Sequence, residues 1–194
     1  MHRRFELWVL ALSVAVFFVA CGGSPPAGAI NSATDALQQA KDAGAADYAK
    51  ASLQAAQDAA DALAAELKVQ EGQTLKTYGK ATTLAAAAEK AAQQAISETR
   101  DAKAKAKASA TAAVDNAKKV LNDVQGLLAK APKGKRGVDL DGMKTELTNA
   151  STTIGQAESS VAAGRFGEAQ QKADSAVRAA TSVRTDLEAA GKKR

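Results

Sequence analysis

The sequence offers few side chains that could carry out chemistry, and the most distinctive of them is its single cysteine, Cys21. A cysteine thiolate is the nucleophile that group-transfer reactions such as lipid attachment require. Cys21 follows an uncharged run of 14 residues, Leu7 to Ala20, which is preceded by Arg3 and Arg4. A basic start, an apolar run too short for a comfortable membrane span and a small residue at its end are typical of a secretory signal peptide. We therefore expect Cys21 to be a modified residue.

The four residues Phe18-Val19-Ala20-Cys21 resemble the lipobox of bacterial lipoproteins, with Phe18 where that family usually has Leu. The resemblance implies that diacylglycerol is attached to the Cys21 thiol and that the chain is cleaved after Ala20. Gly22 rather than Asp after the cysteine implies the outer membrane, facing the periplasm. The alternative is an uncleaved membrane anchor, in which Cys21 is an incidental small apolar residue.

Other kinds of chemistry find little support in the sequence. The only histidine, His2, lies in the segment expected to be removed, so the mature chain would lack the usual base at neutral pH. The acidic pairs Asp58/Asp61 and Asp35/Asp42 lie among Gln and Lys, which is typical of a solvated helix face. The sequence has no cluster of residues with the spacing of metal ligands and no glycine-rich loop with the spacing of a phosphate-binding loop. We predict no enzyme activity, no cofactor and no metal.

Two basic clusters remain as candidates for contact with a partner. The first alternates with alanine along a predicted helix, as on an exposed, solubilising face, and consists of Lys103, Lys105 and Lys107. The second lies in a predicted loop and is the better candidate for contact with an anionic lipid or glycan surface; it consists of Lys133, Lys135 and Arg136. Aromatic residues do not interleave with either cluster, so nucleic acid is not an expected partner.

The composition beyond the N-terminal segment predicts an all-α fold. Ala, Gln, Lys, Asp and Glu dominate, and Pro132 is the one proline after Pro26. Apolar residues step by three and four along six stretches, as in helices that pack along a narrow seam. The predicted seam residues are Ile30, Ala33, Leu37, Ala40, Gly44; Leu53, Ala56, Ala60, Leu63, Leu67; Tyr78, Ala81, Ala85, Ala88, Ala92, Ala95; Val114, Ala117, Leu121, Val124, Leu128; Leu147, Ala150, Ile154, Ala157, Val161; and Phe166, Ala169, Ala173, Ala176, Ala180, Val183, Leu187.

The last three stretches repeat the first three, at shifts of 84, 94 and 88 residues. Helix breaks are expected at Gly44, Gly72, Lys130–Asp139 and Gly164, and one helix of about 75 Å should run without a break from Tyr78 to Lys130. The sequence thus predicts an elongated, antiparallel, coiled-coil-like bundle of two related three-helix units that share a long central helix. The predicted segments are a signal peptide (1–20), a flexible tether (21–29), a first helical unit (30–113), a second (114–190) and a basic tail (191–194).

The segment around the first predicted turn resembles a known family. The helix end Ala36 to Ala43, the turn AGAADYA over residues 43–49 and the start of the next helix at Leu53 and Ala56 resemble the N-terminal part of small bacterial lipoproteins known as the domain of unknown function DUF4398. Lys50 stands where that family often has Pro. The resemblance implies an envelope location and a helical fold, and it carries no established activity.

These observations predict a lipid-anchored protein of the bacterial cell envelope that acts as a structural tether or scaffold through an alanine-rich helical rod. The alternative is a binding module, for peptidoglycan or another anionic envelope polymer through the basic loop, or for a partner protein through exposed helical seams. The seams could close within one chain or between chains, so oligomerisation stays open at this stage.

Overall fold

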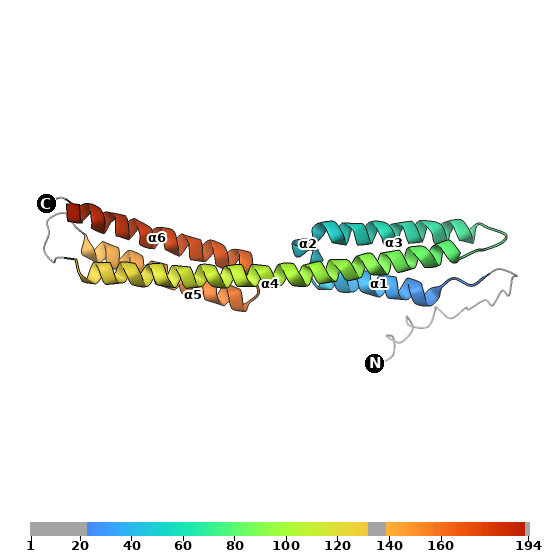
Figure 1. Ribbon diagram of the computed structural model, residues 1–194, viewed down its shortest axis with the longest axis horizontal. Helices are drawn as coiled ribbons and strands as arrows, with labels where there is room; N and C mark the ends of the chain where they lie inside the picture. Colours follow the sequence, from blue (N-terminus) through green and yellow to red (C-terminus); the bar gives the residue numbers. More distant parts are fainter. Residues whose placement is uncertain (1–22, 132–138, 193–194) are drawn as a thin grey trace, which may run out of the picture. The chain divides into compact units, whose positions relative to one another are not determined.

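The computed structural model describes residues 23–131 and 139–192, and within these ranges the chain forms six α-helices and no strands (Figure 1). The prediction of an all-α helical bundle is confirmed. Alanine is the commonest residue in four of the five long helices, and its high helix propensity lowers the cost of ordering the backbone. The helices are α1 (Ala27–Asp42), α2 (Ala45–Tyr48), α3 (Lys50–Glu71), α4 (Gly79–Ala129), α5 (Leu140–Ala162) and α6 (Phe166–Lys192).

The helices end where the sequence predicts breaks. Two of the breaks have a glycine in the left-handed region just after the helix, Gly44 with φ 88° and Gly164 with φ 74°, a conformation that glycine adopts without steric cost. The helix α3 ends immediately before Gly72, and α4 ends immediately before Lys130. The single-turn helix α2, between α1 and α3, was not predicted, because four residues are too few to show a helical period.

The turn after α5 shows why its glycine matters. The backbone N–H of Gly164 donates to the carbonyl of Val161 at 3.0 Å, and that of Arg165 donates to the carbonyl of Ser160 at 2.9 Å. These two bonds form the Schellman arrangement, which satisfies carbonyl groups in the last turn of the helix. It requires a positive φ at the first residue after the C-cap, which here is Gly164. Gly164 therefore sets the direction in which α6 leaves α5.

Substitution of two glycines should change stability in opposite directions. Gly164→Ala should lower the free energy of unfolding by about 1 kcal/mol, because alanine resists a positive φ. Gly155→Ala, inside α5, should raise it by about 0.5–1 kcal/mol, because a Cβ there meets no atom within 4 Å and alanine is the better helix former. Urea denaturation of both variants checks the pair, and equal effects would contradict the role given to Gly164.

The long helix α4 has 51 residues without interruption, as predicted between Tyr78 and Lys130. Its first part packs with α1 and α3, and its second part packs with α5 and α6 (Figure 1). Contacts divide the chain into two compact units: unit 1 contains the described residues up to 46 together with Lys50–Ile96, and unit 2 contains Asp47–Ala49 together with the described part of Ser97–Arg194. In α4 the boundary between the units falls after Ile96. The sequence pattern placed this boundary later, before residue 114.

The core of unit 1 is made almost entirely of alanine. Ala33 of α1, Leu63 of α3 and Ala85 of α4 are buried in one cluster, and Ala36, Ala56 and Ala92 of the same helices form the next. Alanine side chains let helix backbones approach closely. Each removes little apolar area from water, so each contributes far less than the roughly 1.5–3 kcal/mol of a buried Leu or Ile.

The core of unit 2 contains more large side chains than the core of unit 1. Leu121 and Val124 of α4, Leu147 and Ile154 of α5, and Val183 of α6 are all buried in one cluster. A buried Leu, Ile or Val side chain contributes more than a buried Ala, so we expect unit 2 to be the more stable of the two.

Every predicted seam residue is buried or half-buried. The matching positions of the two units agree: Ala33 and Ala117, Leu63 and Ala157, and Ala85 and Ala173 are all buried, at the shifts given by the sequence. Two aromatic residues lie at helix starts, since Tyr78 precedes α4 and Phe166 begins α6.

Candidate functional site

The residues proposed from the sequence as functional lie outside the described residues. These are the lipidation candidate Cys21, with its cleavage point after Ala20, and the basic loop of Lys133, Lys135 and Arg136. Their roles stay predictions. The described helices, which begin at Ala27, contain no stretch long and apolar enough to cross a membrane.

The acidic pairs are solvated, as predicted. Asp35, Asp42, Asp58 and Asp61 are all exposed. Two of them accept hydrogen bonds from glutamines one turn away, at 2.9 Å from Gln38 to Asp42 and at 2.8 Å from Gln54 to Asp58. Over residues 23–131 and 139–192, no three His, Cys, Asp or Glu side chains gather in a way that could hold a metal ion.

The helical lysine cluster is less uniform than the sequence indicates. Lys105 and Lys107 are exposed, but Lys103 is half-buried, and its Nζ lies 5.4 Å from the centre of the Tyr48 ring. This is a cation–π contact, in which the ammonium is attracted to the electron-rich ring face. It joins α4 to the end of α2, so Lys103 helps to hold the short helix. Sequence reasoning missed this role, because the two residues are 55 positions apart.

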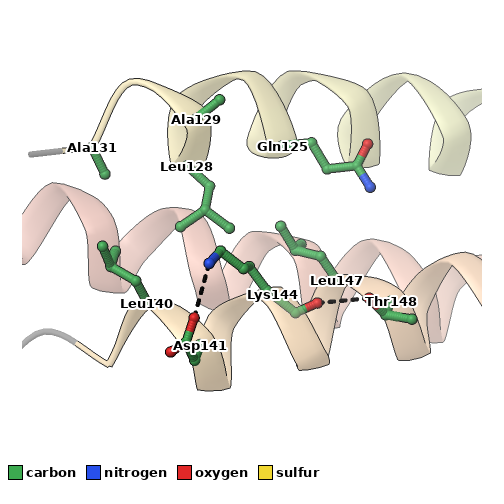
Figure 2. A pocket seen from close by; sticks show the side chains of 9 residues that line it. All are labelled: Gln125, Leu128, Ala129, Ala131, Leu140, Asp141, Lys144, Leu147 and Thr148. Atoms are coloured by element: carbon green, nitrogen blue, oxygen red, sulfur yellow. Dashed lines mark hydrogen bonds and ion pairs between the residues drawn. The ribbon is translucent and has the colours of Figure 1, made fainter. Parts of the chain in front are cut away.

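An open hollow of about 840 Å³ lies in unit 2, between the end of α4 and the beginning of α5 (Figure 2). Leu128, Leu140 and Leu147 form its apolar surface. Its charged side chains are Asp141 and Lys144, whose carboxylate and ammonium are 2.8 Å apart and 91% and 65% exposed. The hydrogen bond from Lys144 lowers the pKa of Asp141, so this carboxylate stays ionised at neutral pH. The charged side chains of the hollow are thus paired with one another, and both are exposed.

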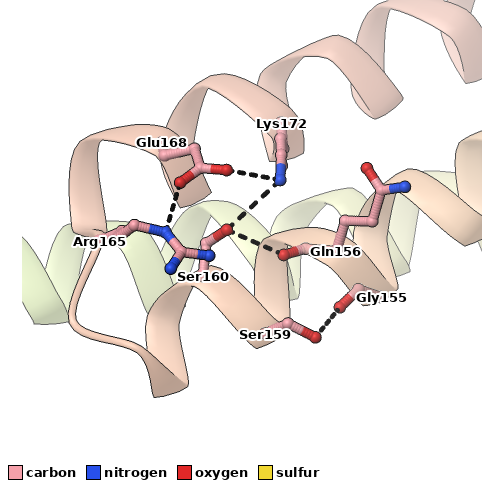
Figure 3. Close-up of polar contacts among 7 residues, drawn as sticks. All are labelled: Gly155, Gln156, Ser159, Ser160, Arg165, Glu168 and Lys172. Atoms are coloured by element: carbon pink, nitrogen blue, oxygen red, sulfur yellow. Dashed lines mark hydrogen bonds and ion pairs between the residues drawn. The ribbon is translucent and has the colours of Figure 1, made fainter.

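The most connected polar cluster lies at the turn between α5 and α6 (Figure 3). Glu168 accepts from Lys172 Nζ at 2.7 Å and from Arg165 Nε at 2.6 Å. Ser160 is fully buried; its hydroxyl donates to the carbonyl of Gln156 and lies 3.5 Å from Lys172 Nζ. The cluster therefore ties the last turn of α5 to the first turns of α6.

These contacts lower the pKa of Glu168 to about 2 from its ordinary value of 4.5, mainly through the hydrogen bond from Lys172 and next through that from Arg165. Glu168 is also in the first turn of α6, where the helix dipole favours a negative charge. Arg165 in the turn and Lys172 in α6 both pair with this carboxylate, so the cluster stabilises the turn.

Stability at acid pH should depend on Glu168. Between about pH 4.5 and 2 the unfolded chain takes up a proton at this carboxyl while the folded chain does not, so the contribution is complete above pH 4.5 and is lost as pH falls toward 2. The stability difference between the natural chain and Glu168→Gln should therefore shrink over this window. Urea denaturation at a series of pH values checks this, and Lys172→Ala should weaken the same dependence. A difference that does not vary with pH would contradict it.

Another polar network, which is buried, lies at the hairpin between α3 and α4. The Glu66 side chain is only 7% exposed; its carboxylate is 2.7 Å from Lys80 Nζ and accepts from Gln70 Nε2 at 2.8 Å. The amide oxygen of Gln70 accepts from the backbone N–H of Thr77 at 2.9 Å. The hydrogen bond from Lys80, and then that from Gln70, lowers the pKa of Glu66. Glu66 and Gln70 thus fix the loop over residues 72–78.

The fold and these clusters define the chain as an all-α helical bundle in which polar side chains secure two hairpin turns, α3–α4 and α5–α6. Comparison with known proteins adds no relative: no family model matches the chain, and no curated protein or solved structure shows significant similarity to it. The resemblance to DUF4398 accordingly stays a prediction.

Proposed function

We propose that this chain is a lipid-anchored protein of the bacterial cell envelope that acts as a structural tether or scaffold. One observation carries the proposal: the apolar run from Leu7 ends on Ala20-Cys21, and the segment after it is rich in Gly, Ser and Pro. An acylated cysteine followed by a short flexible segment would hold the helical bundle at the membrane surface. The outer membrane, and relationship to the DUF4398 lipoproteins, belong to the same proposal.

The polar clusters of the bundle support a structural role over a catalytic one. Glu168 and Glu66 each accept from a lysine and a second donor, and each secures a turn between helices. The hollow beside Leu128 has an apolar surface and one exposed ion pair. In this proposal the helical bundle binds other envelope components through its surface and keeps them at a distance from the membrane.

Mass spectrometry of chain produced in a bacterium tests the proposal directly. The N-terminal residue should be Cys21, and its mass should be increased by a thioether-linked diacylglycerol. A chain that still carries residues 1–20 and an unmodified thiol would refute the anchor. Ser24→Ala is the matched control, because it changes a neighbouring polar residue and should leave cleavage and acylation intact.

A further inference from the structure

Large apolar side chains are exposed at one end of unit 1. In the described ranges the exposed large hydrophobic residues are Leu75, Val69 and Leu127, at 74%, 54% and 44%. Leu75 lies in the loop between α3 and α4, and Val69 lies in the last turn of α3. The two most exposed apolar side chains thus belong to one hairpin end, which we call the α3–α4 end and define as residues 66–80.

The loop that carries Leu75 is held in place. Gln70 accepts from the Thr77 N–H and donates to Glu66, which is paired with Lys80 on the first turn of α4. A buried carboxylate and a side-chain bond to the loop backbone thus fix the position from which Leu75 reaches solvent.

The start of the described chain lies against the same end. A Cβ atom added to Gly23 would be 3.8 Å from Cδ2 of Tyr78, and Figure 1 shows the segment before α1 running toward the α3–α4 loop. Cys21, the proposed lipidation site, precedes Gly23 by two residues in the sequence.

The charges of the α3–α4 end suit an anionic surface. Lys68 and Lys76 outnumber Glu71, while Glu66 and Lys80 neutralise one another. Basic residues beside exposed apolar ones are the usual composition of segments that lie at a bilayer interface.

We propose that the α3–α4 end docks on the phospholipid bilayer, with Leu75 and Val69 at the boundary between headgroups and acyl chains and with Lys68 and Lys76 toward the headgroups. This inference rests on the proposed lipid anchor at Cys21. The anchor supplies attachment, and the docked loop supplies a second, weaker contact that fixes the orientation of unit 1 on the membrane.

An environment-sensitive fluorophore at the loop tests this. Because the thiol of Cys21 is acylated, the full chain with Thr74→Cys has one free thiol, next to Leu75, to which a nitrobenzoxadiazole label is attached. The protein is reconstituted into vesicles of phosphatidylethanolamine and phosphatidylglycerol that contain nitroxide-bearing lipids. The label should be quenched several-fold more than one at Ala46→Cys, an exposed position near the other end of α3, about 33 Å away for 22 helical residues.

Two further variants show whether the leucine is responsible. Leu75→Asp in the Thr74→Cys chain should reduce quenching to the level seen at Ala46→Cys. Leu127→Asp, which changes an exposed leucine in unit 2 in the same way, should leave quenching at Thr74→Cys unchanged. Equal quenching at both label positions, or no effect of Leu75→Asp, would overturn the docking.

Vesicle flotation separates this inference from the proposed function. A chain that floats but is not quenched at Thr74→Cys is anchored and undocked, which overturns only the docking. A chain that does not float overturns both. Fluorescence of the label at Thr74→Cys could also be quenched without nitroxide lipid and more strongly at higher protein concentration. That result would show that the α3–α4 end contacts a second copy of the chain, and it would overturn the docking.

Discussion

A Cys21→Ser chain produced in a bacterium should incorporate no labelled fatty acid and should keep residues 1–20. The hydroxyl of serine is a much weaker nucleophile than a thiolate, and in the proposed maturation cleavage after Ala20 requires the acylated Cys21. Acyl chains bind membranes with about 0.8 kcal/mol per buried methylene, and several chains on one residue hold far more firmly than one. The expected effect is therefore complete loss of lipid and of the mature form.

A displaced thiol is the control for this prediction. The double variant Cys21→Ser/Ala46→Cys places a thiol on the exposed surface of α2, and it should incorporate no fatty acid, because acylation depends on the residues that precede Cys21. Fatty-acid labelling and immunoblotting measure incorporation and processing together. Equal labelling of the natural chain and the Cys21→Ser chain would place the lipid elsewhere and would remove the basis of the proposed anchor.

Ile154→Ala should destabilise unit 2 by about 2–5 kcal/mol, which is a large part of the stability of a bundle of this size. Ile154 is 4% exposed and packs among side chains of α4, α5 and α6. Its loss leaves a cavity, because the helices packed around it relax only partly to fill the space. Thr152→Ala on the exposed face of the same helix should change stability by no more than about 0.5 kcal/mol.

Hydrogen exchange locates the effect of Ile154→Ala. Amide exchange should accelerate most in α5 and α6 and least in α1 and α3, since α1 and α3 belong to the other unit. Denaturation in urea gives the magnitude. Uniform acceleration along the whole chain would contradict the division into two units, and a change similar to that of Thr152→Ala would contradict the packing given to Ile154.

The apolar spacing predicted the helical seams well, because a period of three and four is a direct consequence of helix geometry. Glycine predicted the ends at Gly44 and Gly164 for an equally local reason, the positive φ. The sequence did not predict that Glu66, Gln70, Thr99 and Ser160 are buried. Sequence analysis ordinarily assigns a polar residue in a helix to the surface. Its burial becomes understandable only when the structure shows its hydrogen-bond or ion-pair partner, as Lys80 of α4 does for Glu66 of α3.

The candidate functional features depend on different kinds of information. The lipidation motif is a contiguous pattern, so sequence alone suffices to propose it. The α3–α4 end could not be proposed from sequence, because its elements are the exposure of Leu75, the network around Glu66 and the position of Gly23 beside Tyr78. These relate residues that are up to 55 positions apart.

The continuity of α4 has a consequence for the order in which the chain folds. Starting a helix is costly, whereas extending one adds a hydrogen bond for each residue that is fixed. Once unit 2, with the larger side chains in its core, has formed its part of α4, residues 79–96 can grow from an existing helix end. Unit 1, whose alanine contacts are individually weak, is thereby spared a nucleation step, and its α1 and α3 need only associate with a template already in place.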